Sequence, residues 1–305
     1  MTWVLVRKLL RDVRVAWTVV AVLLFLFQIL WSRITMRVTT QILAAFEAAG
    51  VSPELIMRIL LNQDPRGQSN EMLGQMIQAI IGGERIALDR AQDMMSVSYV
   101  HPLVLSILCI WALGRAANAI AGEIDRGTME LLLAQPIRRS QLIVAHLIVD
   151  AIIAPSLCLA MWLGTYCGTW WMGLQTATNP MQRVDPFRFL PALLCVVMLL
   201  FAVSGLTIAI SSMGRSRARV WGWAITLLLV MFLINVFGQI WPETLEWVRP
   251  FTIHYHYQPQ ALIQATNWGD EPDAWFHLAI LASIGLGGYG FAGIVFCRRD
   301  LPAPL

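Results

Sequence analysis

Long apolar runs alternate with short polar segments along this chain. Six of the runs have about the 20 residues that a helix needs to cross roughly 30 Å of hydrocarbon. They predict an all-α integral membrane protein with six transmembrane helices, at residues 15–31, 96–114, 142–169, 189–212, 220–241 and 274–297.

The segments between the runs also show helical patterns. Residues 1–14 place Arg7, Arg11 and Arg14 on one helical face and apolar side chains on the other, which is typical of a cytoplasmic amphipathic helix lying on the membrane surface. Residues 32–95 are too long for a turn and predict a small helical subdomain on the outer side. Residues 242–273 are expected to form an outer loop, and 298–305 a cytoplasmic tail.

The composition supports a membrane protein and excludes an ordinary water-soluble globular protein. Hydrophobic residues make up 57% of the chain, charged residues only 13%, and the mean hydropathy is +0.63. The five cysteines form no C-x-x-C pair, so no metal site is expected from them. The net charge of +3 is dispersed along the chain, which gives no indication of a nucleic acid partner.

The placement of basic residues predicts the orientation. Basic residues near span ends stay on the cytoplasmic side, and this rule is informative only for short loops. It favours two cytoplasmic termini, because the short segments on that side carry most of the relevant basic residues: Arg7, Lys8, Arg11, Arg14, Arg115, Arg126, Arg138, Arg139, Arg215, Arg217, Arg219, Arg298 and Arg299. We therefore expect a multi-pass protein of the cytoplasmic (inner) membrane of a prokaryote, in contact with membrane lipids.

The cytoplasmic segment 115–141 holds the densest group of charges in its stretch "GEIDRGTMELLLAQPIRRSQL", residues 122–142. Ile120, Ile124, Gly127 and Leu131 follow helical spacing, which predicts one short amphipathic helix that ends at Pro136. Three consecutive leucines, 131–133, would be costly to expose unless a membrane or a partner covered them. The pattern therefore indicates a surface that a membrane or a partner protein covers.

Two residues of the third span are candidates for gating or transport. Asp150 is the one carboxylate within the six apolar runs, and His146 lies one helical turn before it on the same face. A structural hydrogen bond between the two side chains is the simpler interpretation. His254 and His256 lack further ligands for a metal, and the five glycines between 285 and 293 predict a face packed against protein.

The string from Glu123 to His146 resembles the cytoplasmic segment of ABC-2 type permeases, the membrane subunits of ATP-binding cassette exporters. That family's pattern runs roughly E-x-x-x-G-T-x-E-x-L-L-x-x-P-I-x-R-x-x-L-x-x-x-K. The matching positions here are Glu123, Gly127, Thr128, Glu130, Leu132, Leu133, Pro136, Ile137, Arg139 and Leu142. The chain departs from the pattern at His146, where the family usually has lysine, and in its large first outer loop.

The resemblance implies a function and a set of partners. Two permease copies or homologues pair, and each offers the segment as a coupling helix to a separate ABC ATPase subunit, which binds the ATP and Mg²⁺. The residues implied in ATPase coupling are Glu123, Gly127, Thr128, Glu130, Pro136 and Arg139. Glu123 and Glu130 would contact the ATPase, Gly127 would permit a close approach or a bend, and Pro136 would set the turn into the third span. The 32–95 subdomain is a candidate site for an extracytoplasmic partner.

The chain itself is not expected to be an enzyme. A P-loop needs the pattern G-x-x-x-x-G-K-[ST], and Lys8, the single lysine, follows an arginine. We expect no catalytic, cofactor-binding or metal-binding residues in this chain. Two alternatives stay open: an ion-coupled secondary transporter that uses Asp150 and His146, and a membrane anchor or scaffold in which His101, His146 or His277 binds haem.

Overall fold

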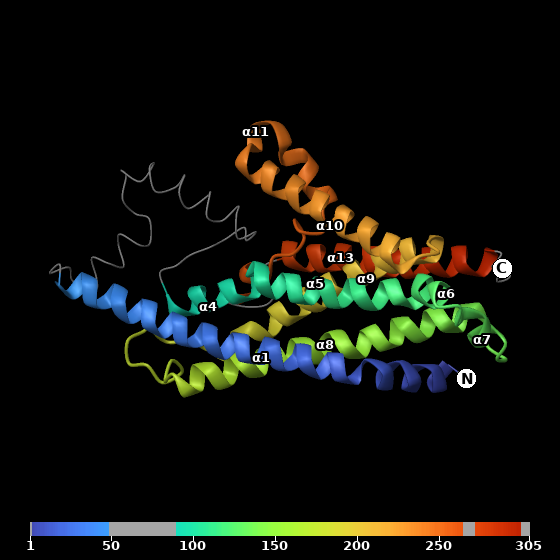
Figure 1. Ribbon diagram of the computed structural model, residues 1–305. Helices are drawn as coiled ribbons and strands as arrows, with labels where there is room; N and C mark the ends of the chain where they lie inside the picture. Colours follow the sequence, from blue (N-terminus) through green and yellow to red (C-terminus); the bar gives the residue numbers. More distant parts are fainter. Residues whose placement is uncertain (1, 49–89, 265–271, 300–305) are drawn as a thin grey trace.

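The computed structural model describes residues 2–48, 90–264 and 272–299, and within these ranges it contains helices and turns but no strand (Figure 1). The elements are α1 (Thr2–Ala48), α4 (Ala91–Val100), α5 (Pro102–Ala117), η1 (Asn118–Gly122), α6 (Glu123–Asp125), α7 (Met129–Leu133), α8 (Arg139–Trp171), η2 (Pro186–Phe189), α9 (Leu190–Met213), α10 (Arg217–Ile240), α11 (Pro242–Leu245), η3 (Glu246–Phe251), α12 (Pro259–Gln264) and α13 (Pro272–Arg298).

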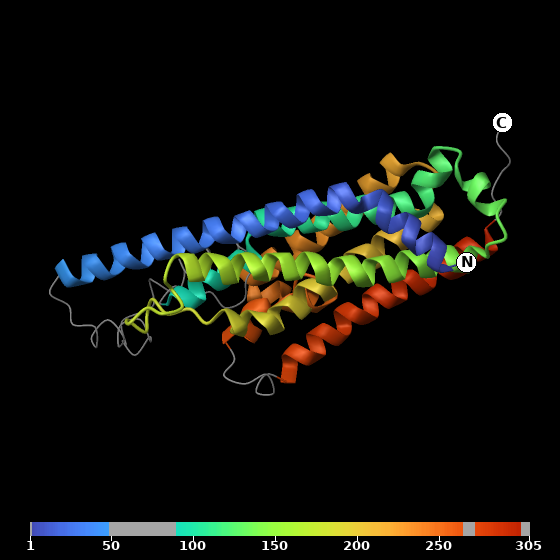
Figure 2. The same cartoon turned by 90° about the horizontal axis from the view of Figure 1, so that it is seen from below.

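Six helical stretches of the described residues are long and apolar enough to cross a membrane. They are Thr2–Gln41, Ala91–Asp125, Arg139–Trp171, Pro186–Met213, Arg217–Ile240 and Asp273–Arg298. The expected six-span helical fold is confirmed. In both views α1 begins and α13 ends at the same end of the bundle, which we call the terminal end, and α7 lies there too (Figures 1 and 2).

The first span is longer than its apolar run. Helix α1 has 47 residues and so extends about 70 Å at 1.5 Å per residue, well beyond the hydrocarbon core. It continues through residues 14 and 32, so the expected boundaries there are not helix ends. Val6 is fully buried in the main hydrophobic cluster, so part of the apolar face of residues 1–14 packs against protein. That this segment lies on the membrane surface stays a prediction.

The expected outer subdomain falls largely outside the described residues, which omit 49–89. Its described ends belong to helices, because α1 continues to Ala48 and α4 begins at Ala91. The second span consists of α4 and α5, joined at His101 and Pro102. There the His101 ring accepts a hydrogen bond from the Leu103 amide at 3.2 Å and so caps α5.

Glycines allow two pairs of spans to pack closely. Helix α8 packs along α1, where a Cβ added at Gly164 would lie 2.5 Å from the Phe25 carbonyl oxygen. Helix α13 packs along α9, where a Cβ at Gly288 would collide with the backbone of Gly205, and one at Gly285 with the Phe201 ring. The expectation of a packed glycine face holds for these two glycines only, since Gly287, Gly290 and Gly293 have open space around them.

Helix α10 buries few of its residues against the other spans. Its buried residues are Val220, Ala224, Asn235 and Gly238, and large apolar side chains such as Trp223 and Leu229 are exposed. Figure 1 shows α10 leaning away from the other spans toward α11. This apolar surface faces outward from the chain, as expected for a helix in contact with lipid or with a second membrane protein.

Candidate functional site

The connection between α5 and α8 contains five of the six residues implied in ATPase coupling, Glu123, Gly127, Thr128, Glu130 and Pro136. We call residues 118–138, which form η1, α6, α7 and the turns around them, the α5–α8 link. The expected single helix up to Pro136 is wrong. Gly127 has a φ of 70°, in the left-handed region that ends a helix, and it separates α6 from α7. The bend expected at Gly127 is therefore present.

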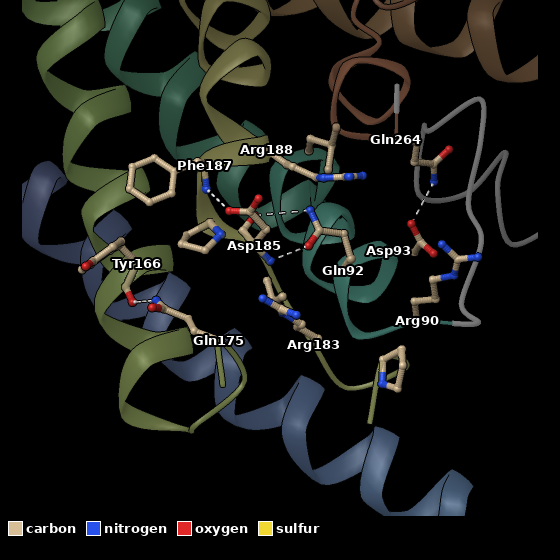
Figure 3. A pocket seen from close by; sticks show the side chains of 14 residues that line it. Arg90, Gln92, Asp93, Tyr166, Gln175, Arg183, Asp185, Phe187, Arg188 and Gln264 are labelled. Atoms are coloured by element: carbon tan, nitrogen blue, oxygen red, sulfur yellow. Dashed lines mark hydrogen bonds between the residues drawn. The ribbon is translucent and has the colours of Figure 1, made fainter. Parts of the chain in front are cut away.

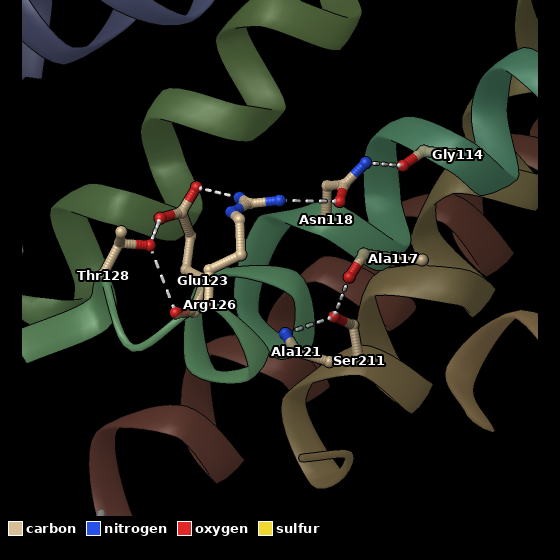
Figure 4. A network of polar contacts seen from close by, with 8 residues as sticks. All are labelled: Gly114, Ala117, Asn118, Ala121, Glu123, Arg126, Thr128 and Ser211. Carbon is tan, nitrogen blue, oxygen red and sulfur yellow. Dashed lines mark hydrogen bonds and ion pairs between the residues drawn. The ribbon is translucent and has the colours of Figure 1, made fainter. Parts of the chain in front are cut away.

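The link begins with a π-helical turn that a side chain from another span explains. The Ala121 amide donates to Ser211 Oγ of α9 at 3.0 Å, and that hydroxyl in turn donates to the Ala117 carbonyl at 3.2 Å (Figure 4). A hydroxyl inserted between a helical N–H and its carbonyl acceptor widens the turn. The start of the link is thus attached to α9.

Glu123 folds the link onto itself. Its carboxylate accepts hydrogen bonds from Arg126 at 2.6 Å and from the Thr128 hydroxyl, on either side of Gly127 (Figure 4). Arg126 also donates to the Asn118 side chain at 3.3 Å. Only 23% of the Glu123 side chain is exposed. In this structure Glu123 and Thr128 shape the turn, and a contact of Glu123 with the ATPase stays a prediction.

Helix α7 presents the open surface of the link. Met129 is buried, whereas Glu130 is exposed and Leu131 is 70% exposed. Pro136 is exposed in the turn between α7 and α8, where it was expected. The link therefore has an inner part held by Glu123 and an outer part formed by α7 and the turn.

Arg139, the first residue of α8, is directed into the protein. Its guanidinium donates to the carbonyls of Phe296 and Arg299 at the end of α13 and lies 5.7 Å from the centre of the Phe296 ring. Arg299 in turn donates to the carbonyls of Ser212 and Gly214 at 2.8 and 2.9 Å, where α9 ends. These two arginines satisfy helix-end carbonyls and join α8, α13 and α9.

A buried polar cluster lies next to the link. Asp150 of α8 accepts hydrogen bonds from Arg115 of α5 and Tyr289 of α13, and Arg115 also donates to the His146 carbonyl at 3.0 Å. The expected hydrogen bond between the His146 and Asp150 side chains is wrong: His146 Nδ1 has no partner among the described residues. Arg115, expected at the start of the cytoplasmic segment 115–141, is buried inside the bundle.

Sequence reasoning missed Arg115 and Tyr289 as partners of Asp150. Arg115 directly follows the expected second span, and Tyr289 stands between two glycines of the last. The isolated carboxylate was the available signal, since a charge within a membrane helix needs a partner of opposite charge or a donor. The isolated carboxylate indicates a nearby arginine such as Arg115 as its partner. The hydrogen bond from Tyr289 could not be predicted, because it depends on how α13 is rotated about its axis.

The histidines do not converge on one site. His256 Nδ1 lies 2.8 Å from His277 Nδ1, and its other nitrogen lies 2.8 Å from the Pro250 carbonyl oxygen. His254 packs instead against the Phe232 ring. Burial lowers the pKa of His254 to about 4 and also lowers that of His256, so both rings are neutral at neutral pH. The described residues contain no group of three potential metal ligands.

The far end of the bundle holds a polar pocket of about 680 Å³ (Figure 3). Three arginines and two aspartates line it: Arg90, Arg183, Arg188, Asp93 and Asp185. Asp185 caps η2 through the Phe187 amide at 3.0 Å, and its own amide donates to the Gln92 side chain at 2.8 Å. None of the residues singled out in the sequence lines this pocket.

Comparison with known proteins identifies the family. A model of the ABC-2 family transporter proteins matches residues 3–301, nearly the whole chain. Among curated proteins, no significant match is found. The match covers all six spans and the α5–α8 link together, so the resemblance of the short segment extends to the complete arrangement. The chain therefore belongs to the ABC-2 transporter family.

Proposed function

We propose that this chain is the membrane-spanning permease subunit of an ABC exporter and that it receives energy from a separate ATPase at the α5–α8 link. Membership of the ABC-2 family and the six apolar helices support a permease role in the membrane. The exporter direction and the site of energy input are our proposal.

The surface of α7 is the observation that carries this proposal. Glu130 and Leu131 project from a five-residue helix at the terminal end, and Leu131 is 70% exposed. A charged and an apolar side chain together suit a protein interface, where the apolar group is desolvated and the charge steers the partner. The bend at Gly127 separates this exposed helix from the buried part of the link.

A movement of the link would be transmitted to four spans, α5, α8, α9 and α13, through polar contacts. Its first turn is bonded to α9 through Ser211, and its last residue is followed by Arg139, which holds the end of α13. The Arg115–Asp150–Tyr289 cluster joins α5, α8 and α13 just beyond it. Hydrogen bonds between helices of this kind resist separation, so a push on α7 is transmitted to helices and not absorbed in a loop.

The same proposal places the partners. The terminal end faces the cytoplasm of a prokaryotic cell, the ATPase binds ATP and Mg²⁺ there, and a second permease copy or homologue completes the transporter. The exposed apolar faces of α1 and α10 are the surfaces available to lipid and to that second copy. An extracytoplasmic partner would bind at residues 32–95.

The structure favours this proposal over the ion-coupled alternative. Asp150, which that alternative would use to bind an ion or a proton, is 6% exposed and bonded to an arginine and a tyrosine. A paired carboxylate with a structural role explains its position inside the bundle. ATP-driven transport needs no titrating group there.

Copurification tests the proposal. The affinity-tagged chain is expressed in its native host, and any P-loop ATPase recovered with it in detergent is identified and quantified by mass spectrometry. Glu130→Arg should lower its recovery by at least about tenfold, because a reversed charge disfavours the complementary partner. Glu243→Arg is the matched control, since Glu243 is exposed in α11 at the opposite end of α10. Absence of the ATPase from the unmodified chain would overturn the proposal.

A further inference from the structure

A groove of about 640 Å³ lies between α1, α5 and the start of α10, toward the terminal end. Its volume is within the range of small-molecule sites, about 300–1,000 Å³. The groove is open to the surroundings of the bundle, because lining residues such as Asp12, Ala16 and Ile110 are exposed. At the depth of a membrane-spanning helix, those surroundings are lipid.

The lining changes from apolar to polar in one direction along two antiparallel helices. On α5 and its continuation, Ile107, Ile110 and Trp111 precede Arg115 and Arg126. On α1, which runs the opposite way, Val20, Ala16 and Val13 lie deeper than Asp12. Both helices therefore offer apolar side chains inside the span and place their charged ones toward the terminal end, where Leu9 of α1 also lines the groove. This gradient matches an amphiphile oriented like a lipid of the adjoining leaflet.

Two side chains of the lining hold buried nitrogen atoms without partners. His146 is 5% exposed, and its Nδ1 has no hydrogen bond to the described residues. The Trp221 Nε1 is likewise buried and unbonded. An indole N–H can only donate, so a group that satisfies Trp221 must supply an acceptor oxygen. Buried polar groups without partners are uncommon, and a ligand is one explanation for a pair of them in one groove.

Arg126 adds a charge at the polar mouth. It bonds to Glu123 and Asn118, but a guanidinium carries five N–H donors and Arg126 keeps donors free for a further acceptor. An ester or phosphate oxygen meets the requirement at Trp221 and Arg126, and at His146 in the tautomer that carries the proton on Nδ1. The apolar part of the groove suits a hydrocarbon chain.

We propose that this groove binds one glycerophospholipid of the surrounding membrane as a resident ligand. One acyl chain lies along Val13, Ala16 and Ile110, and the ester and phosphate oxygens accept hydrogen bonds from Trp221 Nε1 and from His146. The lipid fills the space between α1 and α5 beside the α5–α8 link. This inference depends on the membrane location of the chain and does not require the ATPase.

Photolabelling tests the site. The purified chain is reconstituted in vesicles of phosphatidylethanolamine and phosphatidylglycerol that contain a small share of phosphatidylglycerol with a diazirine in one acyl chain. After irradiation, the labelled peptides are quantified by mass spectrometry. The peptide with Ile110 should carry more label than the peptide with Leu229, an exposed α10 residue that faces bulk lipid. Equal labelling of the two peptides would overturn the proposal.

Variants distinguish a defined lipid-binding site from non-specific contact with bulk lipid. Ala16→Trp should reduce the label at Ile110 by at least about tenfold, because the indole fills the groove. Val19→Trp is the matched control: Val19 is exposed on the same helix but does not line the groove, so the label should persist. Trp221→Phe keeps an aromatic ring without the N–H, and retention of lipid should weaken about two- to tenfold.

Two further outcomes would contradict the proposal. If Ala16→Trp and Val19→Trp reduce the label equally, the probe reports contact with α1 and not a groove. If turnover of ATP by the assembled transporter before irradiation lowers the label at Ile110, the occupant is a transported amphiphile and not a resident lipid. Thermal unfolding of each variant identifies those that are misfolded, and Trp221→Phe then tests the same site with little change in shape.

Discussion

Arg115 of α5 and Asp150 of α8 form an ion pair inside the helix bundle, with side chains that are 6% and 8% exposed. Tyr289 of α13 bonds to the same carboxylate, so one acidic group joins three spans. The pair lies at the end of α5, directly before the α5–α8 link. Its contribution to stability and the shape of the link can be tested separately.

Removal of Asp150 alone should destabilise the protein strongly. Asp150→Leu leaves the buried Arg115 charge without a countercharge, which costs about 3–5 kcal/mol in comparable cases. The double variant Arg115→Met/Asp150→Leu should recover most of the loss, because no buried charge remains. The measurement is thermal unfolding in detergent. A double variant as unstable as Asp150→Leu would show that burial of an unpaired charge is not the cause.

Gly127→Ala should impair coupling while the bundle stays folded. An L-residue at a φ of 70° costs about 1–2 kcal/mol, and a Cβ there meets no atom within 4 Å, so the effect is confined to the backbone of the link. We expect weaker binding of the ATPase in the copurification assay. Gly173→Ala is the control, because Gly173 has the same φ in the turn after α8. Equal effects of the two variants would argue against a role for the link.

Gly288→Ala should loosen the packing of α13 on α9. The added Cβ would collide with the Gly205 carbonyl oxygen, and overpacking of a tight interface typically costs about 1–3 kcal/mol. Gly290→Ala, two residues along the same helix, meets open space and should leave the unfolding temperature unchanged. Comparable destabilisation by both variants would indicate that helix propensity and not close packing governs this span.

Acidification should destabilise the segment around His254. Burial lowers the pKa of this ring to about 4 in the folded protein, from a usual value of 6.5. The unfolded chain therefore binds the proton first, and stability should fall as the pH decreases from about 6.5 toward 4. His254→Gln should show a smaller fall in unfolding temperature between about pH 7 and pH 5 than the unmodified chain. Identical pH profiles would rule out His254 as the group responsible.

The spans were predictable from sequence because their signal is local. A run such as 189–212 has enough consecutive apolar residues to require a helix in lipid, whatever its neighbours are. The ends were less predictable, since helix α1 continues to Ala48 through polar residues outside its apolar run. The apolar periodicity likewise predicts a single helix through Gly127. The structure has a break there, because Arg126 and Thr128, on either side of Gly127, both donate to the Glu123 carboxylate.

The polar contacts of the site were not predictable, because they depend on the rotation of separate helices. Asp150 shares a helical face with His146, and this spacing suggested their pairing. The carboxylate instead bonds to residues 35 and 139 positions away. Arg139 matches the family pattern and is expected to take part in ATPase coupling, and that pattern gives no indication of its bonds to the carbonyls at the end of α13. Contacts between residues of separate helices leave no periodic pattern in the sequence.

Crosslinking from α7 tests the central proposal most directly. A photoreactive p-benzoylphenylalanine is placed at Leu131, and separately at Trp247, which is 71% exposed in η3 at the other end of α10. Cells of the native host that express each variant are irradiated, and adducts with a P-loop ATPase are identified by mass spectrometry. We predict an adduct with the ATPase from Leu131 and none from Trp247. An ATPase that copurifies but forms no adduct at Leu131, or forms one at Trp247, would contradict the assignment of the α5–α8 link.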